Sequence, residues 1–345
     1  MNKPTSTSTS TLFCGIDVSA RSLSVALIEP DHSVSQREFA NSTSGHKALL
    51  GWLVKHNAPV RVSLEATGIY SLDLSLALNA APHIELAVLN PRQVNRFAQT
   101  LRRSKTDAAD AIVLAEYSQR MPFTAWQRPG VEHLHLRTIS RHIESLVVDL
   151  AEVKNRLHTV ANSSTTPRVI LVDLKQAQAA FERRLVKMRS EASKLIQAEP
   201  VLRLRFQLLV SVPGIAQVSA LHILSELLLL PPGMTVRQWV AYSGLDPVHQ
   251  VSGTSLHKPS HISRAGNRHL RRALYMPSLS AVRFDPHLRA FYQTLKTRHK
   301  TGLQALMAVE RKLLHAIYGI FKSGQPYDGK RLFPNIQLEV ESIAG

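Results

Sequence analysis

The segment Leu12-Phe-Cys-Gly-Ile-Asp-Val18, followed by Ser22-Leu-Ser-Val-Ala-Leu-Ile28, decides the fold of the first part of the chain. The first run is almost wholly apolar, and in the second the leucines and the valine alternate with polar or small residues. Alternation with a period of two is typical of strands, so the pair predicts a hairpin that opens a sheet. Further strands are expected at residues 60–64 and 84–89, and helices at 47–56 and 72–78. This order predicts an α/β domain, a mixed sheet flanked by helices.

The middle of the chain has a different pattern. Residues 131–160 and 169–198 contain little Gly or Pro, and their apolar side chains recur at three-four spacing with charges between them. Two long helices fit this pattern best, either as a coiled coil or as two helices packed on their own domain. The all-α part continues with helical spacing over 201–327. The expected division is a flexible tail at 1–11, the α/β domain at 12–130, long helices at 131–200, a helical domain at 201–330 and a tail at 331–345.

The charge of the chain indicates its partners. The 345 residues hold 42 Lys and Arg against 25 Asp and Glu, a formal net charge of +17. An excess of this size on a folded chain favours a polyanion, either nucleic acid or an anionic membrane. The longest strongly apolar stretch, 221–232, is interrupted by His222, Ser225 and Glu226 and is too short to span a bilayer. Cys14 stands alone, which excludes an intrachain disulfide and a Cys-based metal site, so the sequence predicts a cytoplasmic protein.

Four carboxylates occupy positions from which they can converge. Asp17 closes the first strand and Glu65 ends a later one, while Asp107 and Asp110 stand at i and i+3 on one face of an expected helix. Carboxylate oxygens suit a pair of hard cations, and two divalent ions stabilise the attacking and leaving oxygens in phosphoryl transfer. Each acid alone could equally be a turn or helix-cap residue. Their order along the chain is the ribonuclease-H-like arrangement, and it predicts that all four bind metal.

A second candidate lies in the polar, turn-rich segment 246–255, which follows expected helical residues at 236–242. Ser252 precedes Gly253 in an expected loop surrounded by positive charge, where a hydroxyl is placed as a nucleophile towards phosphate needs to be. Ser-Gly pairs are also among the commonest loop sequences. Composition alone therefore leaves an ordinary loop serine as the alternative.

Basic residues gather near both candidates. Residues 250–331 contain fifteen Lys and Arg against three acids, and a second group precedes Asp107. An expected helix from about Gly266 would direct several arginines to one face that neutralises phosphates. The turn at Pro213-Gly214 either holds a phosphate with its backbone amides or merely joins two helices. The expected nucleic-acid contacts are Arg92, Arg96, Arg102, Arg103, Lys105, Gly214, Lys258, Arg264, Arg268, Arg271 and Arg272, and His257, His261 and His269 are expected beside phosphate or solvent.

These motifs together resemble the DEDD insertion-sequence transposases, a family that includes the Piv type of site-specific DNA invertase and recombinases guided by a bridge RNA. The likeness spans about residues 12–328. It rests on Gly15-Ile16-Asp17, Glu65-Ala66-Thr67-Gly68, Asn90-Pro91, Lys105-Thr106-Asp107-Ala108-Ala109-Asp110-Ala111, Pro213-Gly214-Ile215, Ala241-Tyr242-Ser243-Gly244-Leu245, Ser252-Gly253, Ser263-Arg264-Ala265-Gly266 and Leu270-Arg271-Arg272-Ala273-Leu274-Tyr275-Met276.

The resemblance implies a RuvC-like, that is RNase H-like, N-terminal domain, a coiled-coil linker and a helical transposase domain. By the same likeness Asp17, Glu65, Asp107 and Asp110 hold two Mg²⁺ ions, with Mn²⁺ as the alternative. Ser252 is then the nucleophile that forms a covalent phosphoserine with a DNA strand before strand exchange and religation. The implied partners are donor and target DNA, a non-coding bridge RNA, and further copies of the chain as dimers that assemble into tetramers. The implied location is the nucleoid of a prokaryotic cytoplasm.

Two other functions remain as alternatives. A RuvC-like junction nuclease would use a metal-activated water, would form no covalent adduct, and would not need the long C-terminal part that carries Ser252. A nucleic-acid-binding protein without catalysis would need none of the four acids. Within the preferred class, the sequence fits transposition and Piv-type inversion alike.

Overall fold

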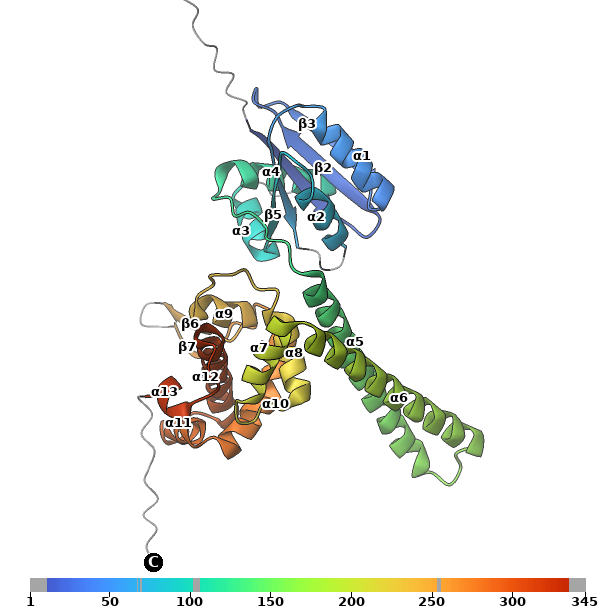
Figure 1. The fold of residues 1–345 in the computed structure, drawn as a ribbon, viewed down its shortest axis with the longest axis vertical. Helices are drawn as coiled ribbons and strands as arrows, with labels where there is room; N and C mark the ends of the chain where they lie inside the picture. The colour runs from blue at the N-terminus through green and yellow to red at the C-terminus, as the bar shows by residue number, and fades with distance from the viewer. Residues whose placement is uncertain (1–10, 67, 69, 102–105, 253–255, 335–345) are drawn as a thin grey trace, which may run out of the picture. The chain divides into compact units, whose positions relative to one another are not determined.

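The computed structural model describes residues 11–66, 68, 70–101, 106–252 and 256–334 (Figure 1). Contacts within the chain divide it into two compact units, Met1–Arg128 and Pro129–Gly345. In the part of the chain so described, each helix is too short or too polar to cross a lipid bilayer.

The first unit is built on a five-stranded mixed sheet in the order β3-β2-β1-β4-β5. The predicted hairpin is present, with Cys14 opposite Leu27, and β4 and β5 continue the sheet in parallel to β1. The sequence did not predict β3, because this strand is mostly exposed and polar and has no buried face to set a period. The strands are β1 Leu12–Val18, β2 Ser22–Ile28, β3 Val34–Ala40, β4 Val60–Glu65 and β5 Ile84–Leu89.

Helices cover both faces of this sheet (Figure 1). Leucines of α1 (Thr43–Val54) and α2 (Leu72–Asn79) join the core formed by Cys14 and Ile16 of β1. The other face is covered by α4 (Asp107–Arg120), which crosses β1, β2 and β4 and packs against α3 (Pro91–Leu101). Helix α4 therefore lies on the side of β1 towards which Gly15 and Asp17 face.

The second unit is a helical bundle with a two-stranded hairpin. The two predicted long helices are present as α5 (Val131–Ala161) and α6 (Arg168–Ala198), which pack along each other. Buried residues in the N-terminal half of α5 and the C-terminal half of α6, among them Ile143 and Ile196, join the core of the bundle. The other elements are α7 Pro200–Val210, α8 Gln217–Leu227, α9 Val236–Ser243, β6 Pro247–Ser252, β7 Leu256–Ile262, α10 Arg268–Phe284, α11 Pro286–Thr297, α12 Gly302–Ser323 and α13 Gly329–Leu332.

The hairpin formed by β6 and β7 differs from the loop expected at 246–255. The strands pair antiparallel, with Pro247 opposite Ile262 and Ser252 opposite Leu256, and the register shifts between Val248 and Gln250. This irregularity breaks the two-residue period by which strands are found in sequence. The mixed α/β first unit and the mostly helical remainder are as predicted.

Candidate active site

Two of the four candidate metal ligands lie at the same end of adjacent strands. Asp17 is the last residue but one of β1, and Glu65 is the last residue of β4. The strands are parallel, and Ile16 lies opposite Leu64, so the next position along each strand holds one of the two acids. Both side chains are half-buried. Residues two apart on a strand face the same way, so Asp17 shares the face of Gly15.

Helix α4 brings the other two acids to that face. A Cβ on Gly15 would lie 2.0 Å from the carbonyl oxygen of Ala111 and 2.3 Å from the nitrogen of Ala115, so only glycine allows α4 to lie this close. Asp107 is the first residue of α4, and Thr106 caps the helix by accepting a hydrogen bond from Ala109 N (3.2 Å). Asp107 is exposed and Asp110 is half-buried in the first turn.

The donor chemistry of these acids fits a divalent cation, since carboxylate oxygens are the ligands that Mg²⁺ and Mn²⁺ prefer. The geometry fits only in part. Across the residues that the structure describes, no group of three or more His, Cys, Asp or Glu side chains lies close enough together to hold a metal ion. The fold thus directs the acids to one face of one sheet without gathering them into a complete ligand set.

The second candidate, Ser252, ends β6 in the other unit. Residues 253–255, which connect it to β7, lie outside the described residues, as do the side chains of 249–260. The base of this hairpin lies within the described residues. There Ser263 N donates to Asp246 O (2.9 Å), Arg264 N donates to Gly244 O (3.1 Å), and the Ser263 hydroxyl donates to the Asp246 carboxylate.

Two glycines allow the hairpin base to form. Gly244 ends α9 in the left-handed conformation, with φ of 70°. A Cβ on Gly266 would lie 2.2 Å from Tyr242 O, so this glycine is required by the close approach of two backbone segments. The segments 241–245 and 263–267 lie side by side because these two positions carry no side chain.

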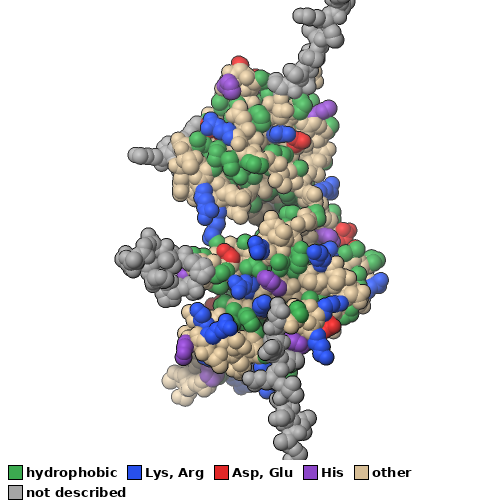
Figure 2. Space-filling model, turned by 90° about the vertical axis from the view of Figure 1, so that its left-hand side faces the viewer, with side chains coloured by type: hydrophobic (Ala, Val, Ile, Leu, Met, Phe, Trp, Pro, Cys, Tyr) green, Lys and Arg blue, Asp and Glu red, His purple; other side chains and the backbone are tan. Residues whose placement is uncertain are grey.

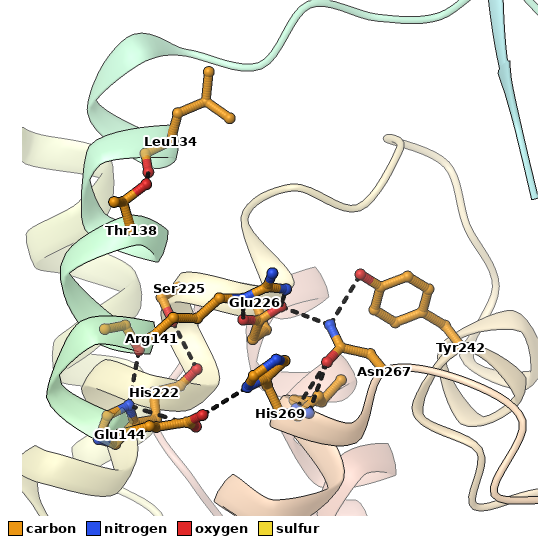
Figure 3. A network of polar contacts seen from close by, with 12 residues as sticks. Leu134, Thr138, Arg141, Glu144, His222, Ser225, Glu226, Tyr242, Asn267 and His269 are labelled. Atoms are coloured by element: carbon orange, nitrogen blue, oxygen red, sulfur yellow. Dashed lines mark hydrogen bonds and ion pairs between the residues drawn. The ribbon is translucent and has the colours of Figure 1, made fainter. Parts of the chain in front are cut away.

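A buried polar network lies under the hairpin base (Figure 3). Glu226 of α8 is 2% exposed and accepts two hydrogen bonds from Arg141 of α5, at 2.8 and 3.0 Å. Asn267 Nδ2 donates to the same carboxylate (2.6 Å) and to the hydroxyl of Tyr242 (3.0 Å). Burial by itself would raise the pKa of Glu226, but the hydrogen bonds from Arg141 and Asn267 and the charge of Arg141 bring that pKa below its ordinary value. Glu226 is therefore an ionised, paired carboxylate.

The same network continues to two histidines. His269, in the first turn of α10, pairs through Nδ1 with Glu144 of α5 (2.6 Å), so it does not lie free beside solvent as expected. His222 contacts the hydroxyl of Ser140 through Nδ1 (2.7 Å), and burial lowers its pKa. Glu144 lies 4.0 Å from that same nitrogen. Ser140 and the carboxylate thus share one ring nitrogen, which is not the arrangement of a base that activates a serine.

This network was not predicted from the sequence as a site. Its signal was present, because His222, Ser225 and Glu226 interrupt the apolar stretch 221–232. An acid in such a stretch requires a buried partner. The partner could not be named, because Arg141 and Asn267 stand 85 and 41 residues away along the chain.

The expected nucleic-acid contacts occupy different environments. Arg92 and Arg96 on α3 are exposed, as are Arg264, Arg268 and Arg272. Arg271 instead turns inward and donates to Ser243 O (2.8 Å), so it does not share an exposed face with Arg268 and Arg272. Arg102, Arg103 and Lys105 lie outside the described residues, and so does the side chain of Lys258. In the view of Figure 2, Lys and Arg side chains are frequent on the surface and acidic ones are sparse.

The turn at Gly214 has a packing role. Gly214 has φ of 93°, and a Cβ there would lie 2.7 Å from both Pro277 O and Ala281 N of α10. The turn therefore lies directly against α10, and this contact accounts for the glycine without a phosphate. His257 also lies among the side chains that are not described, and His261 is exposed.

Comparison with known proteins assigns the family. Residues 14–164 match a model of DEDD transposases of the IS110 type, and residues 206–293 match the model described as "Transposase IS116/IS110/IS902 family"; together these cover more than half of the chain. The pilin gene-inverting proteins of Moraxella bovis and Moraxella lacunata are each 27% identical over 92% of this chain and 97% of their own length. An uncharacterised insertion element IS110 protein of Streptomyces coelicolor is 25% identical over 55% of this chain and 46% of its own. A DEDD-type domain indicates a divalent metal cofactor, and the chain belongs to the IS110-type DEDD transposases, which are DNA recombinases.

Proposed function

We propose that the chain cleaves and rejoins DNA as the transposase or site-specific recombinase of an insertion sequence, with Ser252 as nucleophile and Mg²⁺ bound by Asp17, Glu65, Asp107 and Asp110. The observation that carries the proposal is the position of Asp17 and Glu65 at the same end of adjacent parallel strands, with the first turn of α4 on the same face. Carboxylates converging on one sheet edge suit phosphoryl transfer.

The proposed fold of the first unit is RNase H-like. Its support is the strand order β3-β2-β1-β4-β5, in which three antiparallel strands precede two parallel ones. For α5 and α6 we propose a coiled coil, which is supported by their equal length of 31 residues and their packing along each other.

In the proposed reaction the oxygen of Ser252 forms a bond to a DNA phosphorus while the bond from that phosphorus to one sugar oxygen breaks, and the hydroxyl proton leaves with the sugar oxygen. A divalent cation held by the four acids would supply positive charge to the phosphate. Attack by the sugar oxygen of the exchanged strand then reverses the step and releases the serine, so the phosphodiester is conserved. Exposed arginines such as Arg268 and Arg272, close in sequence to the hairpin, would neutralise neighbouring phosphates.

The four acids belong to the first unit and Ser252 to the second. We propose that the acids of one copy act on the strand held by the serine of another, in dimers that assemble into tetramers on two DNAs. Cleavage would then wait for assembly. A bridge RNA that pairs with donor and target is proposed on the resemblance, with the net charge of +17 as its support.

A second candidate is site-specific inversion. It is favoured by the pilin gene-inverting relatives, whose likeness extends over 92% of this chain and 97% of their own length. The two candidates share the same cleavage chemistry and differ in the arrangement of the recombination sites.

The test is covalent trapping on end-labelled DNA in the presence of Mg²⁺. We expect wild-type protein to remain on DNA after denaturation, Ser252→Ala to lose the adduct and keep DNA binding, and Asp17→Asn to lose cleavage. Ser260→Ala, on the other strand of the hairpin, and Glu85→Gln, an exposed acid paired with Arg61 (2.7 Å), are the matched controls that should stay active.

Adducts that persist in Ser252→Ala would remove the serine from the mechanism. Cleavage by the wild type without any adduct would favour the junction nuclease. Activity that survives EDTA would exclude the metal role of the acids. For the RNA, nuclease treatment of the purified complex should abolish site selection, and unchanged selection would exclude guidance.

A further inference from the structure

Asn267 joins the hairpin to the bundle. It stands between the end of β7 and the start of α10, and its backbone nitrogen donates to Tyr242 O (2.6 Å), the last contact of the hairpin base with α9. Both the oxygen and the nitrogen of the Asn267 side-chain amide form hydrogen bonds. Its oxygen caps α10 by accepting hydrogen bonds from His269 N (2.9 Å) and Leu270 N (3.1 Å).

The side-chain amide nitrogen of Asn267 makes a separate set of hydrogen bonds. It donates to Glu226 Oε2 and to the Tyr242 hydroxyl, so one side chain links α8, α9 and α10 (Figure 3). A serine or aspartate would cap the helix equally well, because capping needs only the acceptor. An aspartate would place a second carboxylate 2.6 Å from Glu226, where like charges repel in a buried site. The asparagine is therefore required by the link to Glu226 rather than by the cap.

Glu226 is in turn held in one orientation. The two hydrogen bonds from Arg141 form a fork that fixes the plane of the carboxylate, and a paired buried carboxylate has few alternative positions. Helix α5 thus sets the orientation of Glu226, Glu226 sets that of Asn267, and Asn267 fixes the point at which the hairpin ends. His269, two residues on, adds a second connection to α5 through Glu144.

We propose that Asn267 is a positioning residue for the reaction: with Glu226 and Arg141 it sets the direction in which the β6–β7 hairpin, and so Ser252, leaves the bundle. This inference rests on the proposed role of Ser252. Asn267 touches neither DNA nor the reacting atoms in this account. It acts by limiting the orientations of the hairpin, as precise placement of a nucleophile requires.

The experiment uses the full chain and three variants. Asn267→Asp keeps the acceptor that caps α10 and removes the amide donor. Asn267→Ser does the same without adding a charge beside Glu226. As a control, Thr301→Ala removes the cap of α12, in which the Thr301 hydroxyl accepts a hydrogen bond from Gln304 N (3.3 Å). The readouts are the rate of adduct formation at saturating DNA, the dissociation constant for DNA, and hydrogen exchange of the amides of β6 and β7.

We expect Asn267→Asp to slow adduct formation at least tenfold, to change the DNA dissociation constant less than twofold, and to speed exchange in β6 and β7. Asn267→Ser should show the same loss of rate with DNA binding retained, and Thr301→Ala should leave the rate and the hairpin exchange unchanged. A purely structural role would speed hydrogen exchange throughout the bundle and would lower DNA binding together with the rate.

Unchanged hairpin exchange in Asn267→Asp would overturn the inference even if no adduct ever forms. A full rate in that variant, with adducts still on Ser252, would overturn it as well. Loss of all adducts in the wild type would instead refute the role of Ser252, and exchange in β6 and β7 would then decide separately whether Asn267 fixes the hairpin.

Discussion

The two regions assigned to the chemistry are organised by different forces. On the sheet face of the first unit, the backbone positions the acids: strand register aligns Asp17 with Glu65, and Gly15 allows α4 to lie close to β1. At the hairpin base of the second unit, the close backbone approach at Gly244 and Gly266 is joined by side-chain contacts of Arg141, Glu226 and Asn267. In the second region the charge of the buried Glu226 carboxylate is balanced by Arg141. The first region therefore depends on strand register and on Gly15, whereas the second depends also on a network of buried side chains.

The largest expected effect comes from breaking the backbone placement in the first region. Gly15→Ala puts a methyl group 2.0 Å from Ala111 O, so α4 must move off the sheet. We expect a loss of about 3 kcal/mol in the free energy of unfolding, at the upper end of overpacking costs, together with loss of DNA cleavage. Urea unfolding monitored by hydrogen exchange in β1 and α4 measures the first, and the trapping assay the second.

The matched control is Gly51→Ala in α1, where the added methyl group meets nothing within 4 Å. There we expect a gain of roughly 0.5–1 kcal/mol, the usual difference between alanine and glycine inside a helix. Equal stability of Gly15→Ala and wild type would mean that α4 does not lie against β1 as described.

The second unit also allows Glu226 to be compared with another buried acid, Glu310. Glu310 of α12 is fully buried, and its carboxyl oxygens have no hydrogen-bond partner among the described residues. Burial raises its pKa to about 8, although the charge of Arg271 lowers it somewhat. The folded chain then keeps a proton that the unfolded chain has lost above its ordinary pKa of 4.5. Stability should therefore fall as pH rises from about 5 to 8, by up to ~1.4 kcal/mol per pH unit.

Glu310→Gln should remove that slope, because an amide has no proton to lose. Urea midpoints at several pH values between 5 and 8 make the comparison, with the exposed Glu152→Gln as control. If the wild-type midpoint and the Glu310→Gln midpoint share one pH dependence, Glu310 is ionised in the folded chain and has a partner, as Glu226 has.

The sequence predicted best what depends on local periodicity. Strands β1, β2, β4 and β5 and the long helices α5 and α6 follow from it, and the alignment of Asp17 with Glu65 follows from the parallel order of the strands. Strand β3 was not predicted because it is polar on both faces. The β6–β7 hairpin was not predicted because a register shift and its prolines conceal the alternation of apolar and polar residues. The contacts of Glu226 could not be predicted for another reason. They join residues far apart along the chain, and spacing carries no information about such pairs.

The smallest effects are expected from substitutions of Arg268, Arg271 and Arg272 in α10. Arg268 and Arg272 are exposed, whereas Arg271 donates to Ser243 O at the end of α9. An arginine on a phosphate releases a counterion, so Arg268→Ala and Arg272→Ala should each weaken DNA binding and reduce the slope of log affinity against log salt by about 1. Arg271→Met should leave that slope unchanged and lower the free energy of unfolding by about 1 kcal/mol, the net contribution of one hydrogen bond. Salt titrations of DNA binding measure the slopes. An equal change of slope in Arg271→Met would place its guanidinium on DNA, and the hairpin base would then have to open when the chain binds.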